Sequence, residues 1–408
     1  MDDVRLELVP TGVAAGGDAL ARDADGRVVF VEGALPGERV AVRITEAHKD
    51  YARAVAVEIL DPSPDRVTPP CPTLAAGCGG CTWQHVTPAA QSRLKAAIVV
   101  DALRRIARLP EPPEPSVVAL DGLALRTTAR LSVSPTARAG HRPRGGKAGD
   151  GAAAAIETDT CLVVHPLLEE LVVHGRYAGA GEVVLRAGVA SGERLVRLDV
   201  PVRQAAVEVP DGVVVVGEGH KGPAFVHEEV AGRWFRVSAD SFFQPGPVAA
   251  AGLVAAVSDA AADALGPGDH LVDAYAGTGL FASVLGAACG ARVTAVESGR
   301  SAAADARANL ADLDAKVVAV EVGRWDAARG GPADLVVADP ARSGLGRPGV
   351  AALVAAGAPR MVVVSCDPAS LARDTVLLGV AGYRLTSVAL VDAFPHTFHV
   401  EAVARFDR

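Results

Sequence analysis

The stretch that decides the fold is LVDAYAGTGLFA, residues 271–282. Its apolar start predicts a buried strand, its glycines predict a tight turn, and the apolar residues after them predict the start of a helix. Gly277 and Gly279 let the backbone approach a ligand closely, and the helix N-terminus offers free N–H groups there. Taken alone, the pattern fits an ordinary tight turn as well as a nucleotide site.

A second strand supports the nucleotide interpretation. RVTAVE, residues 292–297, ends in Glu297, and an acidic residue about 20 positions after the glycine turn accepts hydrogen bonds from the ribose hydroxyls of a nucleoside. Further strands follow, with helices between the first five, which predicts a largely parallel, doubly wound sheet. The predicted strands lie at 270–275, 292–297, 316–321, 334–339, 360–365, 384–391 and 399–406.

The details of this half favour S-adenosylmethionine over a dinucleotide. The turn lacks the third glycine that packs the helix below a pyrophosphate. ADLVVADPARSG, residues 333–344, also places Asp339 at the end of the fourth strand, beside the point where ligands bind in such sheets. A dehydrogenase is the alternative for the domain, and a helix N-cap is the alternative for Asp339.

The rest of the chain predicts two more domains. Residues 1–61 alternate apolar and polar positions in short runs, as in a small β-barrel, and the proline-rich DPSPDRVTPPCP (61–72) marks its end. A helix is predicted at 88–108 and a second β-rich region at 115–235. We therefore expect a multidomain α/β protein: an N-terminal β-barrel (1–61), a central β-rich domain (62–240) and a Rossmann-like C-terminal domain (241–408).

Composition limits the setting of this protein. The 408 residues are half hydrophobic, but they contain no run of 18 or more apolar residues, and the N-terminus lacks signal-peptide features. We expect a cytoplasmic protein without a membrane partner. The net charge of −8 argues weakly against a basic nucleic-acid-binding surface. Either a local basic groove or a solvated loop explains one cluster of cations: Arg126, Arg130, Arg138, Arg142, Arg144 and Lys147.

Cysteines gather in the segment CPTLAAGCGGCTWQH, residues 71–85. Cys71, Cys78 and Cys81 lie close together there, and Cys161 is the only other cysteine before the C-terminal domain. Zinc sites usually come as two close pairs, whereas three clustered thiols plus a distant one suit an iron–sulfur cluster. Unlinked buried cysteines are the alternative.

Another cysteine, Cys366, ends a predicted strand in VVVSCDPASLAR, residues 362–373. A thiolate at the rim of the donor site adds to C6 of a pyrimidine, which makes C5 nucleophilic toward a methyl group. The C5 proton then needs a base, and Glu401 lies in an otherwise apolar strand. Structural burial is the alternative for Cys366. For His396 and His399 we favour packing or positioning over a metal site.

Several segments carry a family resemblance: SCDPASLARD (365–374), FPHTFHVE (394–401), DPARSG (339–344), SFFQPG (241–246) and DAYAGTGLF (273–281). They resemble motifs of the RNA 5-methyluridine methyltransferases, particularly the iron–sulfur branch that modifies 23S ribosomal RNA. The N-terminal GRVVFVEGALPGERV (26–40) is similar to a TRAM domain, an RNA-binding barrel. The likeness covers nearly the whole chain.

The resemblance implies roles for individual residues. Cys366 is then the nucleophile and Glu401 the base that abstracts the C5 proton. A [4Fe–4S] cluster is bound by Cys71, Cys78, Cys81 and Cys161. S-adenosylmethionine is contacted by Gln244, Tyr275, Gly277, Gly279, Glu297 and Asp339. Leu280 departs from the polar residue usual after the second glycine, so one donor contact is lost or replaced there.

Substrate and alternatives follow from the same likeness. We expect structured RNA as the substrate, ribosomal rather than transfer RNA, with a role in rRNA processing. We expect a monomer without a DNA partner. One alternative is cytidine C5 methylation, which commonly uses a second cysteine, and only Cys289 is spare. The other is an RNA chaperone whose methyltransferase domain no longer acts.

Overall fold

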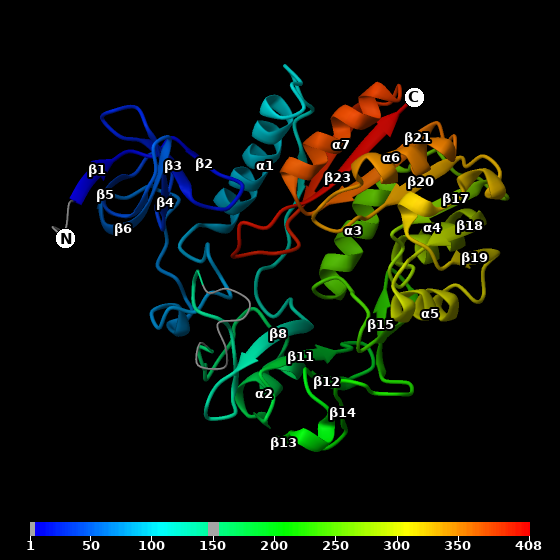
Figure 1. Cartoon of the computed structure of the whole chain (residues 1–408), viewed down its shortest axis with the longest axis horizontal. Coiled ribbons are helices and arrows are strands. Elements are labelled where there is room, and N and C mark those ends of the chain that lie inside the picture. Colours follow the sequence, from blue (N-terminus) through cyan, green and yellow to red (C-terminus); the bar gives the residue numbers. More distant parts are fainter. Residues whose placement is uncertain (1–4, 146–154) are drawn as a thin grey trace.

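The computed structural model describes residues 5–145 and 155–408 (Figure 1). Its N-terminal part is a six-stranded sheet in the order β1-β5-β6-β4-β3-β2, built around its own hydrophobic core. This agrees with the small all-β unit expected from the alternating sequence. The strands are β1 (Arg5–Leu8), β2 (Gly12–Val13), β3 (Ala19–Arg22), β4 (Val28–Glu32), β5 (Arg39–Ala47) and β6 (Tyr51–Asp61).

A long helix, α1 (Pro88–Arg105), follows the cysteine segment and its short 3-10 helix Pro72–Leu74. The helix predicted over 88–108 therefore exists and ends three residues earlier. Its buried residues Val99, Ala102 and Leu103 belong to the same hydrophobic core as one face of the C-terminal sheet. In Figure 1, α1 lies between the N-terminal sheet and α7 (Pro368–Val380).

The central part contains a five-stranded sheet in the order β14-β12-β11-β8-β9. A helix that the sequence analysis did not predict, α2 (Pro166–Val173), packs on this sheet with Leu168, Leu171 and Val172. The central strands are β8 (Thr128–Val133), β9 (Ala139–Gly140), β11 (Glu182–Ala187), β12 (Arg194–Leu198) and β14 (Val213–Val216), with two smaller pairs, β10 (Arg176–Ala178) with β13 (Ala206–Glu208) and β15 (Phe225–Val230) with β16 (Arg233–Ser238).

The C-terminal part is an eight-stranded sheet in the order β19-β18-β17-β20-β21-β23-β22-β7. The first five of these strands are mutually parallel, and β23 is antiparallel to both of its neighbours. The strand positions confirm the prediction of a doubly wound sheet. They are β17 (His270–Ala274), β18 (Arg292–Val296), β19 (Ala315–Val318), β20 (Leu335–Ala338), β21 (Arg360–Ser365), β22 (Arg384–Val391) and β23 (Glu401–Asp407).

Helices cover both faces of this sheet. Alternate strand residues divide between two cores: Leu271 and Val293 pack on one face, and Val272 and Val336 on the other. This division follows from the two-residue period of a strand. The remaining helices are α3 (Pro247–Ala260), α4 (Leu280–Cys289), α5 (Arg300–Asn309) and α6 (Gly346–Ala355).

Two features of the sheet differ from the sequence-based expectation. The connection from β19 to β20 holds only the 3-10 helices Val322–Arg324 and Ala327–Gly330, because Gly331 at φ 73° followed by a proline stops a helix there. The eighth strand, β7 (Ser116–Val118), comes from the segment expected in the central domain and pairs in parallel with β22. The domain boundaries at 61 and 240 stay predictions.

No helix among residues 5–145 and 155–408 combines the length and apolar character needed to cross a bilayer.

Candidate active site

A cavity of about 650 Å³ opens at the carboxyl ends of β17, β20 and β21. The sheet order reverses between β17 and β20, which is where open α/β sheets bind ligands. The cavity brings together residues that lie far apart in the sequence. From the predicted site it includes Gln244, Tyr275, Gly277, Glu297, Asp339, Cys366 and Glu401. Gly279 is not among the lining residues.

The glycine turn fixes the carboxylate of Glu297. Gly277, at φ 56°, donates its backbone N–H to Glu297 Oε2 over 2.8 Å, and Gly299 donates its own to Oε1 over 2.5 Å. Tyr275, just before the turn, has φ 60°, a strained conformation for a residue with a side chain and one that often occurs at functional sites. These hydrogen bonds fix Glu297 against the glycine turn beside the cavity.

Gly279 is not among the lining residues, and its expected contact with the donor stays a prediction. It lies at the N-cap of α4 with φ 85°, and a Cβ atom there would come within 3.3 Å of the Leu310 side chain. Its glycine is therefore required by the turn and by close packing against Leu310. Sequence spacing alone does not separate this packing role from ligand contact.

Asp339 follows β20, and its carboxylate faces the cavity. Gln244 Nε2 donates to Asp339 Oδ2 over 3.3 Å, which links the segment before α3 to the fourth strand. Burial raises the pKa of Asp339 to about 7, and the hydrogen bond from Gln244 opposes that rise. A second carboxyl, Asp273 in β17, behaves similarly: its pKa is raised to about 7 by burial, and it accepts the N–H of Ala282 over 2.8 Å.

Cys366 and Glu401 are neighbours because of strand pairing. In the antiparallel pair β21–β23, Ser365 lies opposite Ala402, and continuing that register places Cys366 opposite Glu401. Directly opposite residues have Cβ atoms about 5 Å apart. A nucleophile and a carboxylate thus meet at one end of two paired strands, and Glu401 is only 6% exposed.

The electrostatics of this pair are those of a low-dielectric site. Burial raises the pKa of the Cys366 thiol to about 11, and the negative charges of Glu401 and Asp339 add to the rise. Burial likewise raises the pKa of Glu401 well above its usual value, and Asp339 contributes in the same direction. Arg342 opposes both shifts. The arrangement favours a neutral thiol in the free protein and gives the ionised carboxylate high basicity.

The cavity also contains residues that the sequence analysis did not assign to the site. Arg342 lies within the DPARSG motif and lines the cavity, so its place in that motif was the available signal. Phe242, which is 68% exposed, lines the cavity beside the predicted Gln244. Its position in the Phe-Phe-Gln segment, next to the predicted Gln244, was a signal that could have identified Phe242 as a site residue.

His399 lines the cavity too, packed between Phe394 and Phe398 with ring centroids at 5.7 and 4.6 Å. Burial lowers its pKa to about 4, so the ring is neutral near pH 7. Within the described parts of the chain, no three His, Cys, Asp or Glu side chains surround a common point as metal ligands would. Packing or positioning of His396 and His399 stays the prediction.

The four predicted cluster cysteines line one small second cavity in the central part: Cys71, Cys78, Cys81 and Cys161. All four are free thiols. Burial raises the pKa of Cys161 to about 11 and also raises those of Cys78 and Cys81. His141 shares the cavity, with its Nε2 atom 3.9 Å from Cys161 Sγ. The thiols surround a common space without forming a preformed site for a single ion.

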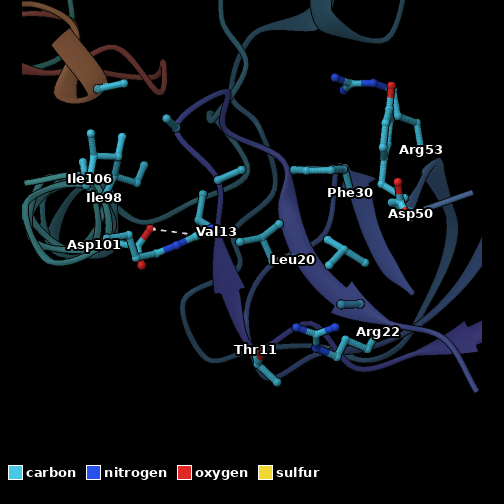
Figure 2. A pocket seen from close by; sticks show the side chains of 18 residues that line it. Thr11, Val13, Leu20, Arg22, Phe30, Asp50, Arg53, Ile98, Asp101 and Ile106 are labelled. Atoms are coloured by element: carbon cyan, nitrogen blue, oxygen red, sulfur yellow. Dashed lines mark hydrogen bonds and ion pairs between the residues drawn. The ribbon is translucent and has the colours of Figure 1, made fainter. Parts of the chain in front are cut away.

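A third cavity, of about 990 Å³, separates the N-terminal sheet from α1. Figure 2 shows Val13, Leu20 and Phe30 on one side, and Ile98 of α1 and Ile106 just after it on the other. Tyr51 meets the edge of Phe30 at 5.9 Å between ring centroids, and the Arg53 guanidinium lies 5.4 Å from the centre of the Phe30 ring. Aromatic faces with an adjacent arginine are typical of surfaces that bind single-stranded nucleic acid.

Four of the five described arginines of the basic cluster form ion pairs, and Arg126 forms none with a described residue. Arg130 and Arg142 both pair with Glu182, and Arg138 pairs with Glu157. Lys147, the last member of the cluster, lies outside the described residues. In the described part, the cluster is closer to an ion-paired surface than to an open basic groove.

Comparisons with known proteins agree with this geometry. The TRAM domain family matches residues 11–57, and the family described as tRNA (Uracil-5-)-methyltransferase matches residues 332–407. The second match contains Asp339, Cys366 and Glu401.

Relatives match the chain over nearly its full length. An RNA methyltransferase of Streptomyces avermitilis is 38% identical over 99% of this chain and 98% of its own. A 23S rRNA (uracil(1939)-C(5))-methyltransferase of Acidithiobacillus ferrooxidans is 32% identical over 96% of this chain and 95% of its own.

A solved structure has a similar fold. The Pyrococcus abyssi tRNA (uracil-54, C5)-methyltransferase, in complex with S-adenosyl-L-homocysteine, superposes with a TM-score of 0.75. The match covers 98% of this chain and 100% of that one, at 24% identity. At that identity the likeness concerns the fold.

Proposed function

The chain belongs to the RNA (uracil-C5)-methyltransferase family, which uses S-adenosylmethionine, and we propose that it methylates C5 of a uridine in 23S ribosomal RNA through a covalent adduct on Cys366. The observation that carries the proposal is the strand register that sets Cys366 opposite Glu401 at the end of β21 and β23. Asp339 and the glycine turn line the same cavity.

The donor half of the cavity fits a nucleoside with a charged tail. Glu297, held by two backbone N–H groups, keeps lone pairs free to accept ribose hydroxyls. Gln244, Tyr275, Gly277 and Asp339 line the rest of this half. S-adenosylmethionine, when bound, supplies an electrophilic methyl group. Leu280 lines the cavity at the position where a polar residue is usual in the family, and it offers only apolar contact there.

The reaction follows from the Cys366–Glu401 pair. Arg342 favours the ionised forms of both groups, and the Cys366 thiolate, its proton lost to solvent, forms a bond to C6 of the uracil. C5 thereby becomes nucleophilic and would take the methyl group from the sulfonium of S-adenosylmethionine, whose S–CH3 bond breaks to leave S-adenosylhomocysteine. Glu401 then removes the C5 proton, the electrons of that C–H bond re-form the C5–C6 double bond, and the sulfur–C6 bond breaks to release the thiolate.

RNA binding is assigned to the N-terminal TRAM unit together with α1. The groove with Phe30, Tyr51 and Arg53 offers stacking and cationic contacts for a single-stranded segment. Such contacts offset the few kcal/mol that extruding a base from an RNA stack costs. Ala369, three residues after Cys366, also lines this groove, so the groove extends toward the reacting cysteine. Ribosomal RNA is favoured because full-length relatives are named for 23S rRNA.

The four central cysteines would hold the [4Fe–4S] cluster. The donor set supports this assignment, since four free thiols line one buried space and no carboxylate does. The cluster would join the 71–81 segment to Cys161 as a structural link, since methyl transfer consumes no electrons.

The structure disfavours the cytidine alternative. Cys289, the one spare cysteine, ends α4 and is not among the residues that line the active-site cavity. The deciding experiment is mass spectrometry of nucleosides from 23S rRNA and tRNA of cells with and without the gene. Loss of one 5-methyluridine from 23S rRNA supports the proposal. Loss of a 5-methyluridine from tRNA instead would show that the substrate is tRNA. Loss of a 5-methylcytidine would overturn the uracil assignment for this chain.

A further inference from the structure

The loop between β22 and β23, residues 392–400, leads into Glu401. Two of its residues, Phe394 and His399, line the active-site cavity. The loop lies beside α1 in Figure 1, although α1 comes about 300 residues earlier in the chain. Contacts from α1 therefore hold the loop that leads into the catalytic end of β23.

Lys95 of α1 makes the central contact. Its ammonium donates to Asp392 Oδ1 over 2.5 Å and to the carbonyl oxygen of Phe394 over 2.9 Å. The Lys95 side chain is fully buried, and that of Asp392 is 5% exposed. Ser92, one turn earlier, donates to the other Asp392 oxygen over 3.3 Å. Asp392 directly follows Val391, which lies opposite Glu401 in the β22–β23 pair.

Gln91 of α1 secures the middle of the same loop. Its Oε1 atom accepts the N–H of His396 over 2.6 Å. The carbonyl of His396 in turn accepts the backbone N–H groups of Thr82 and Trp83 over 2.9 and 2.8 Å. These bonds hold His396 at φ 63°, a left-handed conformation that a residue with a side chain adopts rarely.

A buried ion pair is a weak source of stability, because desolvation cancels most of its attraction and apolar side chains of similar volume often serve as well. The charge of Lys95 therefore calls for another explanation. Around Glu401 the ionisable groups are Asp339, Cys366, Arg342, His399, Asp392 and Lys95. His399 is neutral near pH 7, so the cations are Arg342, which is exposed, and Lys95, which solvent does not screen.

We propose that Lys95 is a positioning residue for Glu401: it fixes the 392–400 loop and supplies a buried positive charge that favours the ionised, proton-accepting form of this carboxylate. The inference rests on the proposed function, in which Glu401 removes the C5 proton.

The charge effect has a definite sign. Arg342 and, to a smaller extent, Lys95 lower the pKa of Glu401 against the rise caused by burial and Asp339. A base acts only when ionised, so loss of Lys95 moves the acid side of the rate profile to higher pH. Elimination of the methylated product, the step that needs the base, becomes the slowest step.

The test variant is Lys95→Met/Asp392→Asn. Lys95→Met alone would leave the Asp392 carboxylate buried without its cation, whereas the double variant removes both charges and leaves no uncompensated one. Lys95→Arg keeps a cation. The matched control is Arg360→Met/Asp407→Asn, which removes a partly buried ion pair at the end of β21–β23 far from Cys366 and Glu401, where Arg360 Nε lies 2.8 Å from Asp407 Oδ1.

The measurements use the full-length protein and a transcript of the 23S rRNA region that relatives methylate. We expect the acid limb of kcat to move to higher pH in the double variant, with kcat lost on that limb. We also expect covalent enzyme–RNA adduct to build up on denaturing gels while KM for RNA is unchanged. Lys95→Arg restores most of the wild-type profile, and the control pair leaves it in place.

Failure of this inference is distinguishable from failure of the proposed function. RNA carrying 5-fluorouridine at the target position traps the wild-type enzyme and the double variant alike, because trapping precedes the step that needs Glu401. If the wild type is not trapped, the proposed function fails. If the wild type is trapped but the double variant shows neither adduct accumulation nor a moved acid limb, Lys95 has a structural role only and the inference is wrong.

Discussion

Replacing Asp339 with asparagine should make the protein more stable and less active. In the folded chain, burial raises the pKa of Asp339 from 3.8 to about 7. The folded state therefore holds the proton more tightly than the unfolded state does. Stability from this group is present below pH 4 and is lost as the pH rises toward 7. Asparagine has no charge to bury, so the variant does not lose this stability as the pH rises.

The size of the effect follows from the shift. A rise of about three pKa units corresponds to about 4 kcal/mol at 1.36 kcal/mol per unit. The full value is not expected, because Asp339 is partly open to the cavity and its charge also interacts with that of Glu401. We therefore expect the free energy of unfolding to rise by roughly 2–3 kcal/mol at pH 8 and by close to none at pH 4. The hydrogen bond from Gln244 is kept, because the asparagine side chain also offers an oxygen acceptor.

The assay is scanning calorimetry of Asp339→Asn and wild type at several pH values from 4 to 8, with donor binding followed by titration calorimetry. Asp314→Asn, which replaces an exposed carboxylate, is the control and should run parallel to wild type. Donor affinity should fall in Asp339→Asn, in keeping with the common conflict between stability and activity at functional sites. A variant that is no more stable than wild type at pH 8, or that gains equally at pH 4, refutes the reasoning.

Other predictions concern the base, the cysteine cavity and the groove. Glu401→Gln should lower kcat by about 10²–10⁴-fold and accumulate covalent adduct on denaturing gels; full turnover in this variant would exclude Glu401 as the base. Cys161→Ala should lose iron and the visible absorption of the purified protein, whereas Cys289→Ala should keep both; equal iron in the two variants would contradict the cluster assignment. Phe30→Ala/Tyr51→Ala should weaken RNA binding in filter-binding assays by about 1–3 kcal/mol per stacked base and leave donor affinity unchanged. Unaltered RNA affinity would show that the RNA does not bind in this groove.

Much of the C-terminal half could be predicted from sequence because local chemistry determines it. Short, continuous apolar runs set the buried strands, and the glycine turn 277–279 marks where the first strand gives way to a helix. Sequence could not say which sheet a short apolar run joins, so β7 was expected in the central domain although it pairs with β22. Edge pairing of this kind depends on contacts distant in sequence.

The site divides in a similar way. Cys366 and Glu401 were identifiable as reactive residues in unusual places, but their opposition comes from the β21–β23 register, which no local pattern reveals. Gly277 and Gly279 look alike in sequence, yet one lines the cavity and the other packs against Leu310. Lys95 was missed because a lysine in a helix is nearly always solvated, and its burial depends on a partner about 300 residues away.

The most direct test of the account is to incubate the enzyme with S-adenosylmethionine and 23S rRNA transcript carrying 5-fluorouridine at the target position, then to map the adduct by peptide mass spectrometry. The account predicts a stoichiometric adduct, stable to denaturation, in which the RNA is joined to the peptide that contains Cys366. It also predicts that Cys366→Ala forms none. An adduct on another residue, or methylation of uridine RNA by Cys366→Ala, would contradict the central claim.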